Sequence, residues 1–260
     1  MLQEYEKLST ERVDNAYLLQ KKIDEVEKML GSLPDSGPKQ ILDGWLVEAR
    51  SDAADAKDAF RFQFGQQLKA LFEQDGVKVR GQYPLLRMGM FTLRMNFDFG
   101  DATLFFGPEV EKLRSKIPLQ PRTIYDIIKQ YDSGMKSGLA DLNKIYEDLS
   151  GAYQRCLKVS GKSPGHKVLI SDVLREYVFS RQSKQFGIDA RRENFHEYPR
   201  INLSYMLYGL RTNRIAGDVM RLHVATFDAT VDKVRSFWVP DNEEGDGTHY
   251  EYISFEEPHE

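Results

Sequence analysis

The chain has 260 residues, of which 41% are hydrophobic and 29% charged, and it contains a single cysteine, Cys156. This composition is typical of a folded protein and excludes disorder along the whole chain, while one cysteine excludes an internal disulfide framework. No apolar run approaches about 18 residues and the first residues lack an apolar signal segment, so we expect a cytoplasmic protein without a membrane partner.

The formal net charge of −4 conceals three blocks of different sign. Residues 1–75 carry a net charge of −5, residues 76–240 carry +9, and residues 241–260 carry −8. We expect these blocks to be a helical hairpin, a basic α+β body and an acidic tail that contains a last strand. The basic block indicates a surface able to attract a polyanion, for which the acidic tail would compete.

Two long helices are predicted in the first block. Over residues 1–31, apolar side chains recur every three or four positions, and a cluster of Gly, Ser and Pro at 31–38 ends the pattern. A second stripe runs from Leu42 to Leu71 with small residues in its middle. These arms predict an antiparallel helical hairpin, whose stripe either packs on the body or docks a partner helix.

The pattern changes to strands after residue 88. Apolar and polar residues alternate from Phe91 to Phe97, a Phe-Gly-Asp turn follows, and Ala102 to Phe106 returns, which together predict a β-hairpin. Residues 109–116 follow a proline, begin with acids and end with bases. This charge order is typical of a short helix.

Helices are expected next at about 122–132, 137–158 and 170–186, and strands at about 201–211, 219–227, 234–239 and 248–255. Because helices and strands do not alternate regularly, the pattern excludes a doubly wound sheet. The predicted fold class is α+β, with an N-terminal antiparallel helical hairpin followed by a mixed helix and antiparallel-sheet body.

Known catalytic motifs are incomplete in this sequence. Gly161-Lys162-Ser163 resembles the end of a phosphate-binding loop, but position 156 is a cysteine where that motif needs glycine, which favours a polar loop. Asp98-Phe99-Gly100 matches a kinase tripeptide without the rest of the kinase set, so a hairpin turn explains it. The histidines and the cysteine form no metal-ligand spacing, and we expect no resident cofactor.

Four acids near the predicted β-hairpin support one enzymatic alternative. Asp98, Asp101, Glu109 and Glu111 lie close in sequence and beside a lysine, a set that can hold Mg²⁺ for phosphodiester hydrolysis. Their spacing differs from that of restriction-type nucleases. A Mg²⁺-dependent nuclease is therefore the weaker hypothesis, and Mg²⁺ is expected only under it.

Basic residues interleaved with aromatic residues provide the stronger functional signal. Arginine binds phosphate through several donors, and aromatic rings can stack on bases. The alternative is that these cations solvate helices and pair with local acids. The candidate nucleic-acid-binding residues are Lys78, Arg80, Arg87, Arg94, Arg181, Lys184, Arg191, Arg192, Arg211 and Arg214.

These observations favour a non-enzymatic accessory subunit of a multiprotein complex that acts on DNA or RNA. The hairpin would dock a protein partner, such as a coiled-coil ATPase or a nuclease subunit, while the basic body contacts phosphates. A bacterial DNA-processing or phage-defence assembly is the setting that this hypothesis suggests. A pure protein scaffold without nucleic-acid contact is the third reading.

Overall fold

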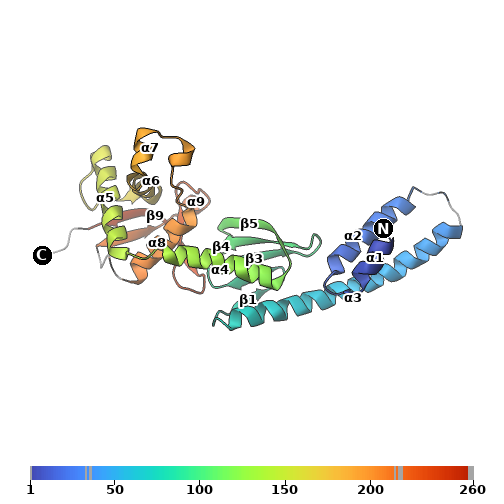
Figure 1. Ribbon diagram of the computed structural model, residues 1–260. Helices are drawn as coiled ribbons and strands as arrows, with labels where there is room; N and C mark the ends of the chain where they lie inside the picture. Colours follow the sequence, from blue (N-terminus) through green and yellow to red (C-terminus); the bar gives the residue numbers. More distant parts are fainter. Residues whose placement is uncertain (1, 33, 35–36, 214, 216–218, 257–260) are drawn as a thin grey trace. The chain divides into compact units, whose positions relative to one another are not determined.

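The computed structural model describes residues 2–32, 34, 37–213, 215 and 219–256 (Figure 1). It has the predicted α+β fold, with N-terminal helices, a five-stranded antiparallel sheet and a second sheet. No helix within these described ranges is long and apolar enough to cross a membrane.

The chain divides into two compact units whose limits differ from those of the charge blocks. The first consists of Met1–Met88, Thr92–Phe105 and Lys112–Ile127, and the second of Gly89–Phe91, Phe106–Glu111 and Ile128–Glu260.

Three helices open the first unit: α1 (Leu2–Ser9), α2 (Ala16–Leu30) and α3 (Gly37–Glu73). Helices α2 and α3 form the predicted hairpin, and its core consists of large residues of α2 against small residues of α3. Ala49 and Ala53 are 3% and 1% exposed, so the two helices approach closely at these positions. The principal side chains of this core are Leu19, Ile23, Val26, Leu30, Leu46, Ala49 and Ala53.

The prediction of one helix over residues 1–31 was wrong, because α1 ends at Ser9. The side chains of Ser9 and Thr10 donate hydrogen bonds to the carbonyls of Tyr5 and Lys7, and the Asn15 side chain donates to the Leu8 carbonyl at 3.1 Å. Short polar side chains that bind the local backbone compete with helix continuation. The turn at 10–15 therefore separates two helices within one apolar pattern.

The five strands of the first sheet lie in sequence order. Their buried side chains are mainly Leu86, Met88, Leu93, Met95, Ala102 and Leu104. Buried aromatic and leucine side chains of the second half of α3 contribute to the same unit, and the Tyr83 hydroxyl donates to the Arg61 carbonyl of α3 at 2.6 Å. The strands are β1 (Val79–Gln82), β2 (Leu85–Met88), β3 (Phe91–Asn96), β4 (Asp101–Phe106) and β5 (Glu111–Pro118).

The helix predicted over residues 109–116 is wrong, because residues 111–116 belong to strand β5 and residues 109–110 to the turn before it. Gly107 and Glu109 have φ angles of 65° and 61°, and the Glu109 amide donates to the Gly107 carbonyl at 2.8 Å. This left-handed turn reverses the chain, so that the next residues join β4 in the sheet. Pairing with a neighbouring strand outweighs the local charge order that favoured a helix.

The second unit combines helices with a sheet built around β9. Strand β9 pairs antiparallel with β6, β7 and β8, so it is central to this sheet. The strands are β6 (Val168–Leu169), β7 (Met220–Val224), β8 (Phe237–Pro240) and β9 (Gly247–Phe255). The helices are α5 (Leu142–Ser160), α6 (Ile170–Ser180), α7 (Lys184–Ile188), α8 (Arg200–Thr212) and α9 (Phe227–Thr230), with α4 (Pro121–Ser137) between the sheets in sequence and a 3₁₀ turn at Arg192–Asn194.

The strand predicted at 201–211 is instead helix α8. Nearly every side chain from Ile201 to Leu210 is buried, so the helix has no polar face and no visible helical period. A continuous apolar run does not distinguish a buried helix from a buried strand. A Cβ added to Gly209 would lie 2.7 Å from the Leu139 Cδ1 atom. The glycine therefore allows α8 to approach the Leu139 side chain closely.

Candidate nucleic-acid interface

Three arginines lie on the outer face of the first sheet. Arg80 of β1 and Arg87 of β2 are direct partners in the antiparallel register, so their side chains are on the same face. The neighbours of Arg87, Leu86 and Met88, are buried on the opposite face. We call Arg80, Arg87 and Arg94 the basic face.

Arg94 of β3 joins this face by the same alternation. Its neighbours Leu93 and Met95 are buried, whereas Arg94 is exposed. Its guanidinium lies 5.2 Å from the centre of the Phe105 ring, a cation–π contact that orients the arginine beside an aromatic surface. All three arginines also take part in contacts within the fold. Because a guanidinium has five N–H donors, a bound phosphate would share these donors with the contacts already present.

Like charges directly opposite each other weaken a sheet. The pairing of Arg80 with Arg87 therefore indicates that these arginines have a role other than stabilising the sheet. Between residues 76 and 120 the sequence has seven bases and four acids, and the acids lie in or beside the β3–β4 and β4–β5 turns. The cations are therefore concentrated along the strands. An arrangement of this kind suits a polyanion that spans adjacent strands.

Strand β5 adds cations that were not predicted as binding residues. Lys112, Arg114 and Lys116 are all exposed. They occupy alternate positions, and a period of two indicates a strand. That signal was missed because residues 109–116 were interpreted as a helix.

Two predicted arginines of the second unit have structural contacts instead. The Arg181 guanidinium pairs with Asp148 of α5, contacts the Tyr198 hydroxyl at 3.1 Å and lies over Tyr177. Two nitrogens of Arg211 donate to Asp241 at 3.1 Å, and this arginine lies over Tyr250. These contacts hold segments of the second unit together.

The other predicted cations surround α7 and the 3₁₀ turn. Lys184, Arg191 and Arg192 are exposed, and Arg191 pairs with Asp189. Arg214 lies outside the described residues. Lys78, which precedes β1, is exposed and belongs to the first unit with the basic face. The nine predicted residues that the structure describes thus fall into two units, and among them a common face is formed by residues of the first unit.

The four acids of the nuclease hypothesis are not brought together. Asp98 and Asp101 lie at the β3–β4 turn, whereas Glu109 and Glu111 lie at the β4–β5 turn. A strand of six residues separates these turns by roughly 17 Å. Within the part of the chain that the structure describes, no group of three or more His, Cys, Asp or Glu side chains could hold a metal ion.

The Glu111 carboxylate forms ion pairs with two cations of the second unit. It lies 3.0 Å from Arg200 and 2.8 Å from Lys233, and the Glu111 side chain is 19% exposed. Burial lowers the pKa of Arg200, while the Glu111 charge opposes that effect. The same guanidinium lies 4.1 Å from the Phe237 ring centre. This arrangement gives Glu111 a role in charge compensation.

Cys156 lacks the electrostatics of a nucleophile. Burial, together with Glu176 and Asp172, raises the pKa of its thiol to about 11. The reactive species is the thiolate, so this thiol stays protonated and unreactive at neutral pH.

No protein-family model matches the chain, and no curated protein or solved structure is significantly similar to it.

Proposed function

We propose that the chain is a non-enzymatic accessory subunit of a multiprotein assembly that acts on nucleic acid. The basic face would contact phosphates, and the helical hairpin would dock a protein partner. The observation that carries this proposal is the placement of three arginines from adjacent strands on one face, two of them directly opposite each other.

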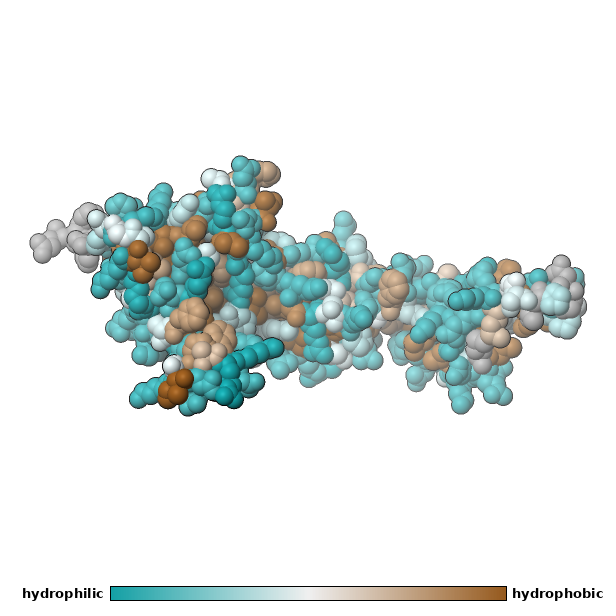
Figure 2. Space-filling model, turned by 90° about the horizontal axis from the view of Figure 1, so that it is seen from above, coloured by the Kyte–Doolittle hydropathy of each residue, from teal (hydrophilic) through white to brown (hydrophobic). Residues whose placement is uncertain are grey.

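The surface of the helical hairpin supports the docking role. Several large apolar side chains of α2 and α3 are exposed, although these helices already have a buried core. Figure 2 shows hydrophobic patches among hydrophilic residues on the surface of these helices. Exposed apolar groups that the fold does not use indicate a contact surface. They are Leu18, Met29, Ile41, Val47 and Phe62, which are 52%, 53%, 75%, 67% and 67% exposed.

The binding role is tested by the salt dependence of affinity for labelled duplex DNA and single-stranded RNA. Phosphate contacts release counterions, so the logarithm of the affinity falls linearly with the logarithm of the salt concentration. Arg80→Gln and Arg94→Gln should each reduce this slope by about 1. The matched control is Arg122→Gln on α4, whose side chain is 72% exposed, and it should leave the slope unchanged.

Flat, weak binding that ignores salt and the arginine substitutions would reject nucleic-acid contact and favour a protein scaffold. For the partner, the chain is isolated from its native source and the bound proteins are identified. An ATPase or nuclease subunit is the expected companion, in keeping with a DNA-processing or phage-defence assembly. Cleavage of DNA by the purified chain with Mg²⁺, lost in Asp98→Asn, would overturn the non-enzymatic role.

A further inference from the structure

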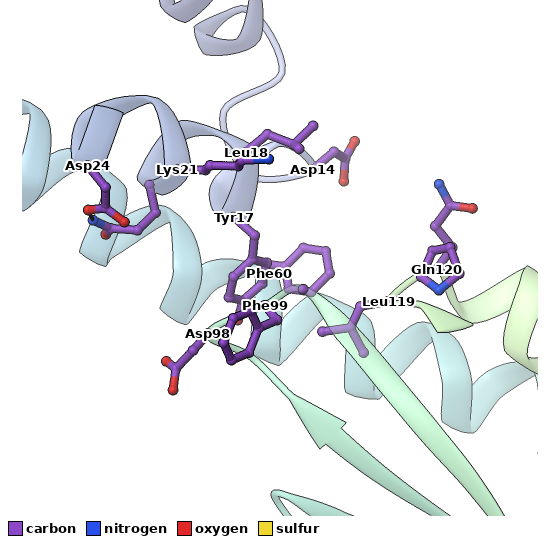
Figure 3. A pocket seen from close by; sticks show the side chains of 13 residues that line it. Asp14, Tyr17, Leu18, Lys21, Asp24, Phe60, Asp98, Phe99, Leu119 and Gln120 are labelled. Atoms are coloured by element: carbon purple, nitrogen blue, oxygen red, sulfur yellow. Dashed lines mark hydrogen bonds between the residues drawn. The ribbon is translucent and has the colours of Figure 1, made fainter. Parts of the chain in front are cut away.

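The first unit contains a hollow of about 660 Å³ where the helical hairpin meets the β3–β4 turn (Figure 3). Its walls come from four segments: the start of α2, Phe60 of α3, the turn at 98–100, and residues 118–120 at the entry to α4. It therefore joins residues that are far apart in sequence.

The hollow has an aromatic and aliphatic wall. Phe99 is 79% exposed at the tip of the turn, and Leu18 of α2 is 52% exposed. Behind them the Tyr17 and Phe60 rings meet edge to face, with centres 5.3 Å apart. Figure 3 shows Tyr17, Phe60, Phe99 and Leu119 grouped together. An exposed phenylalanine and an exposed leucine that line the same hollow offer apolar surface for the side chain of a ligand.

The walls are fixed to each other by the fold. Gly100 has a φ of 67°, and a Cβ on this residue would lie 3.2 Å from the Tyr17 Cβ, so the turn is seated against α2. The Leu119 amide donates to the Gly100 carbonyl at 3.2 Å, which ties the third segment to the same turn. A site with its walls held in this way is largely preformed.

The charges around the hollow are mainly negative. Asp14, Asp24 and Asp98 line it together with a single cation, Lys21. Gln20 donates to Asp24 at 2.8 Å. Neither Asp14 nor Asp98 forms an ion pair with any residue that the structure describes. A hollow with an apolar wall and an excess of carboxylates is complementary to a cationic, apolar segment.

We propose that this hollow docks a segment of a partner protein in which Lys or Arg side chains flank one large apolar side chain. The apolar side chain would lie against Phe99 and Leu18, and the cations would face Asp14 and Asp98. This inference rests on the proposed role of the hairpin as the docking element, and it supplies the chemistry of the partner.

The test uses the full chain and two short fluorescein-labelled peptides: one contains Lys, Leu and Ala with a helical apolar stripe, and its counterpart has Glu for each Lys. Fluorescence anisotropy should show at least roughly tenfold stronger binding of the Lys peptide. Phe99→Ser and Asp98→Asn should each weaken that binding by about tenfold. The matched controls are Phe227→Ser on α9 and Asp43→Asn on α3, both exposed and outside the hollow, and they should leave this binding unchanged.

Equal binding of the two peptides, no binding of the Lys peptide, or insensitivity to the Phe99 and Asp98 substitutions would overturn the inference. A concentration-dependent dimer that Phe99→Ser dissociates would identify a second copy of the chain as the occupant and would also overturn it. Duplex DNA affinity is measured on the same preparations. If DNA binding remains salt-dependent and the Lys peptide does not bind, only the docking inference is rejected. If the Lys peptide binds and DNA binding is weak and independent of salt, only the nucleic-acid role is rejected.

Discussion

Glu111 illustrates at the scale of one residue how a carboxylate can resemble a catalytic group in sequence and have another role in the fold. It is largely buried between Arg200 and Lys233. Breaking such a pair leaves a partly buried charge without compensation, and the remaining exposure reduces that cost.

We therefore expect Glu111→Gln to lower the free energy of unfolding by about 1–2 kcal/mol. Urea unfolding at neutral pH is the measurement. Glu197→Gln, at an exposed position of the same unit, is the control and should stay within about 0.5 kcal/mol of the parent chain. Equal stability of the two variants would contradict the compensating role.

Two histidines of the second sheet give stability a pH dependence. Burial lowers the pKa of His223 and that of His249 below the ordinary value of 6.5. His223 Nε2 lies 2.9 Å from the Ser254 hydroxyl, and His249 Nδ1 lies 3.3 Å from that of Ser236. Because the unfolded chain binds protons at these residues more readily, the unfolding free energy should fall as the pH drops through 6.5 towards the lower folded values.

The combined His223→Gln and His249→Gln variant should flatten this pH dependence, measured by urea unfolding at steps between neutral pH and about pH 5. Parallel stability curves for the variant and the parent chain would show that other groups are responsible.

At the scale of elements, Gly107 is required by both conformation and space. It has a φ of 65°, and an added Cβ would lie 2.9 Å from the Trp238 ring. Gly161 has the same φ, but a Cβ added there would have no atom within 4 Å. A substitution at Gly161 therefore measures the cost of the backbone conformation without a steric contact. We expect Gly161→Ala to cost about 1 kcal/mol and Gly107→Ala about 3 kcal/mol in thermal or urea unfolding. Equal costs would exclude the Trp238 contact as a determinant.

The close approach of α2 and α3 makes a second element-scale prediction. Ala53 is 1% exposed in their contact, whereas its neighbour Ala54 is exposed. Ala53→Leu should cost about 2 kcal/mol through overpacking, while Ala54→Leu should change stability by less than about 0.5 kcal/mol. Circular dichroism during urea unfolding compares the two, and a similar loss in both would disprove close packing.

Sequence patterns predicted the elements that have one buried face. The α2–α3 hairpin and strands β3 and β4 show clear periods of 3.6 and 2. Helix α8 and strand β5 were misassigned because burial on all sides hides the period of the first, and a left-handed turn at Gly107 directs the second into the sheet.

The candidate sites depend even more on tertiary structure. Alternation placed Arg94 on a polar face, but the register that sets Arg80 against Arg87 is not visible in either strand alone. Ion pairs made by Arg181 and Arg211 are equally invisible in the sequence. The hollow beside Phe99 joins four distant segments, so no local pattern predicts it.

At the scale of the whole molecule, the acidic residues after 240 include a strand that the second sheet requires. Tyr250, Ile253 and Phe255 of β9 are buried, and buried Glu251 pairs with Arg235 at 2.9 Å. Removing a central strand exposes the pairing edges of its neighbours.

Deletion of residues 241–260 should therefore abolish hydrogen-exchange protection in α8 and β8, whereas protection in α2 and α3 should persist, because those helices have their own core. Retained protection in α8 together with tighter DNA binding would instead identify this acidic segment as a shield over a cationic surface.

The central position of β9 also has a consequence for protein synthesis. Its partners β6, β7 and β8 all precede it in the chain, and β6 pairs with it across about eighty residues. A ribosome releases the α2–α3 hairpin early, and this local structure is able to fold while translation continues. The second sheet has to wait until residues 247–255 have left the exit tunnel. A prematurely terminated chain thus carries a folded helical hairpin but open strand edges, which mark it for chaperones and proteases.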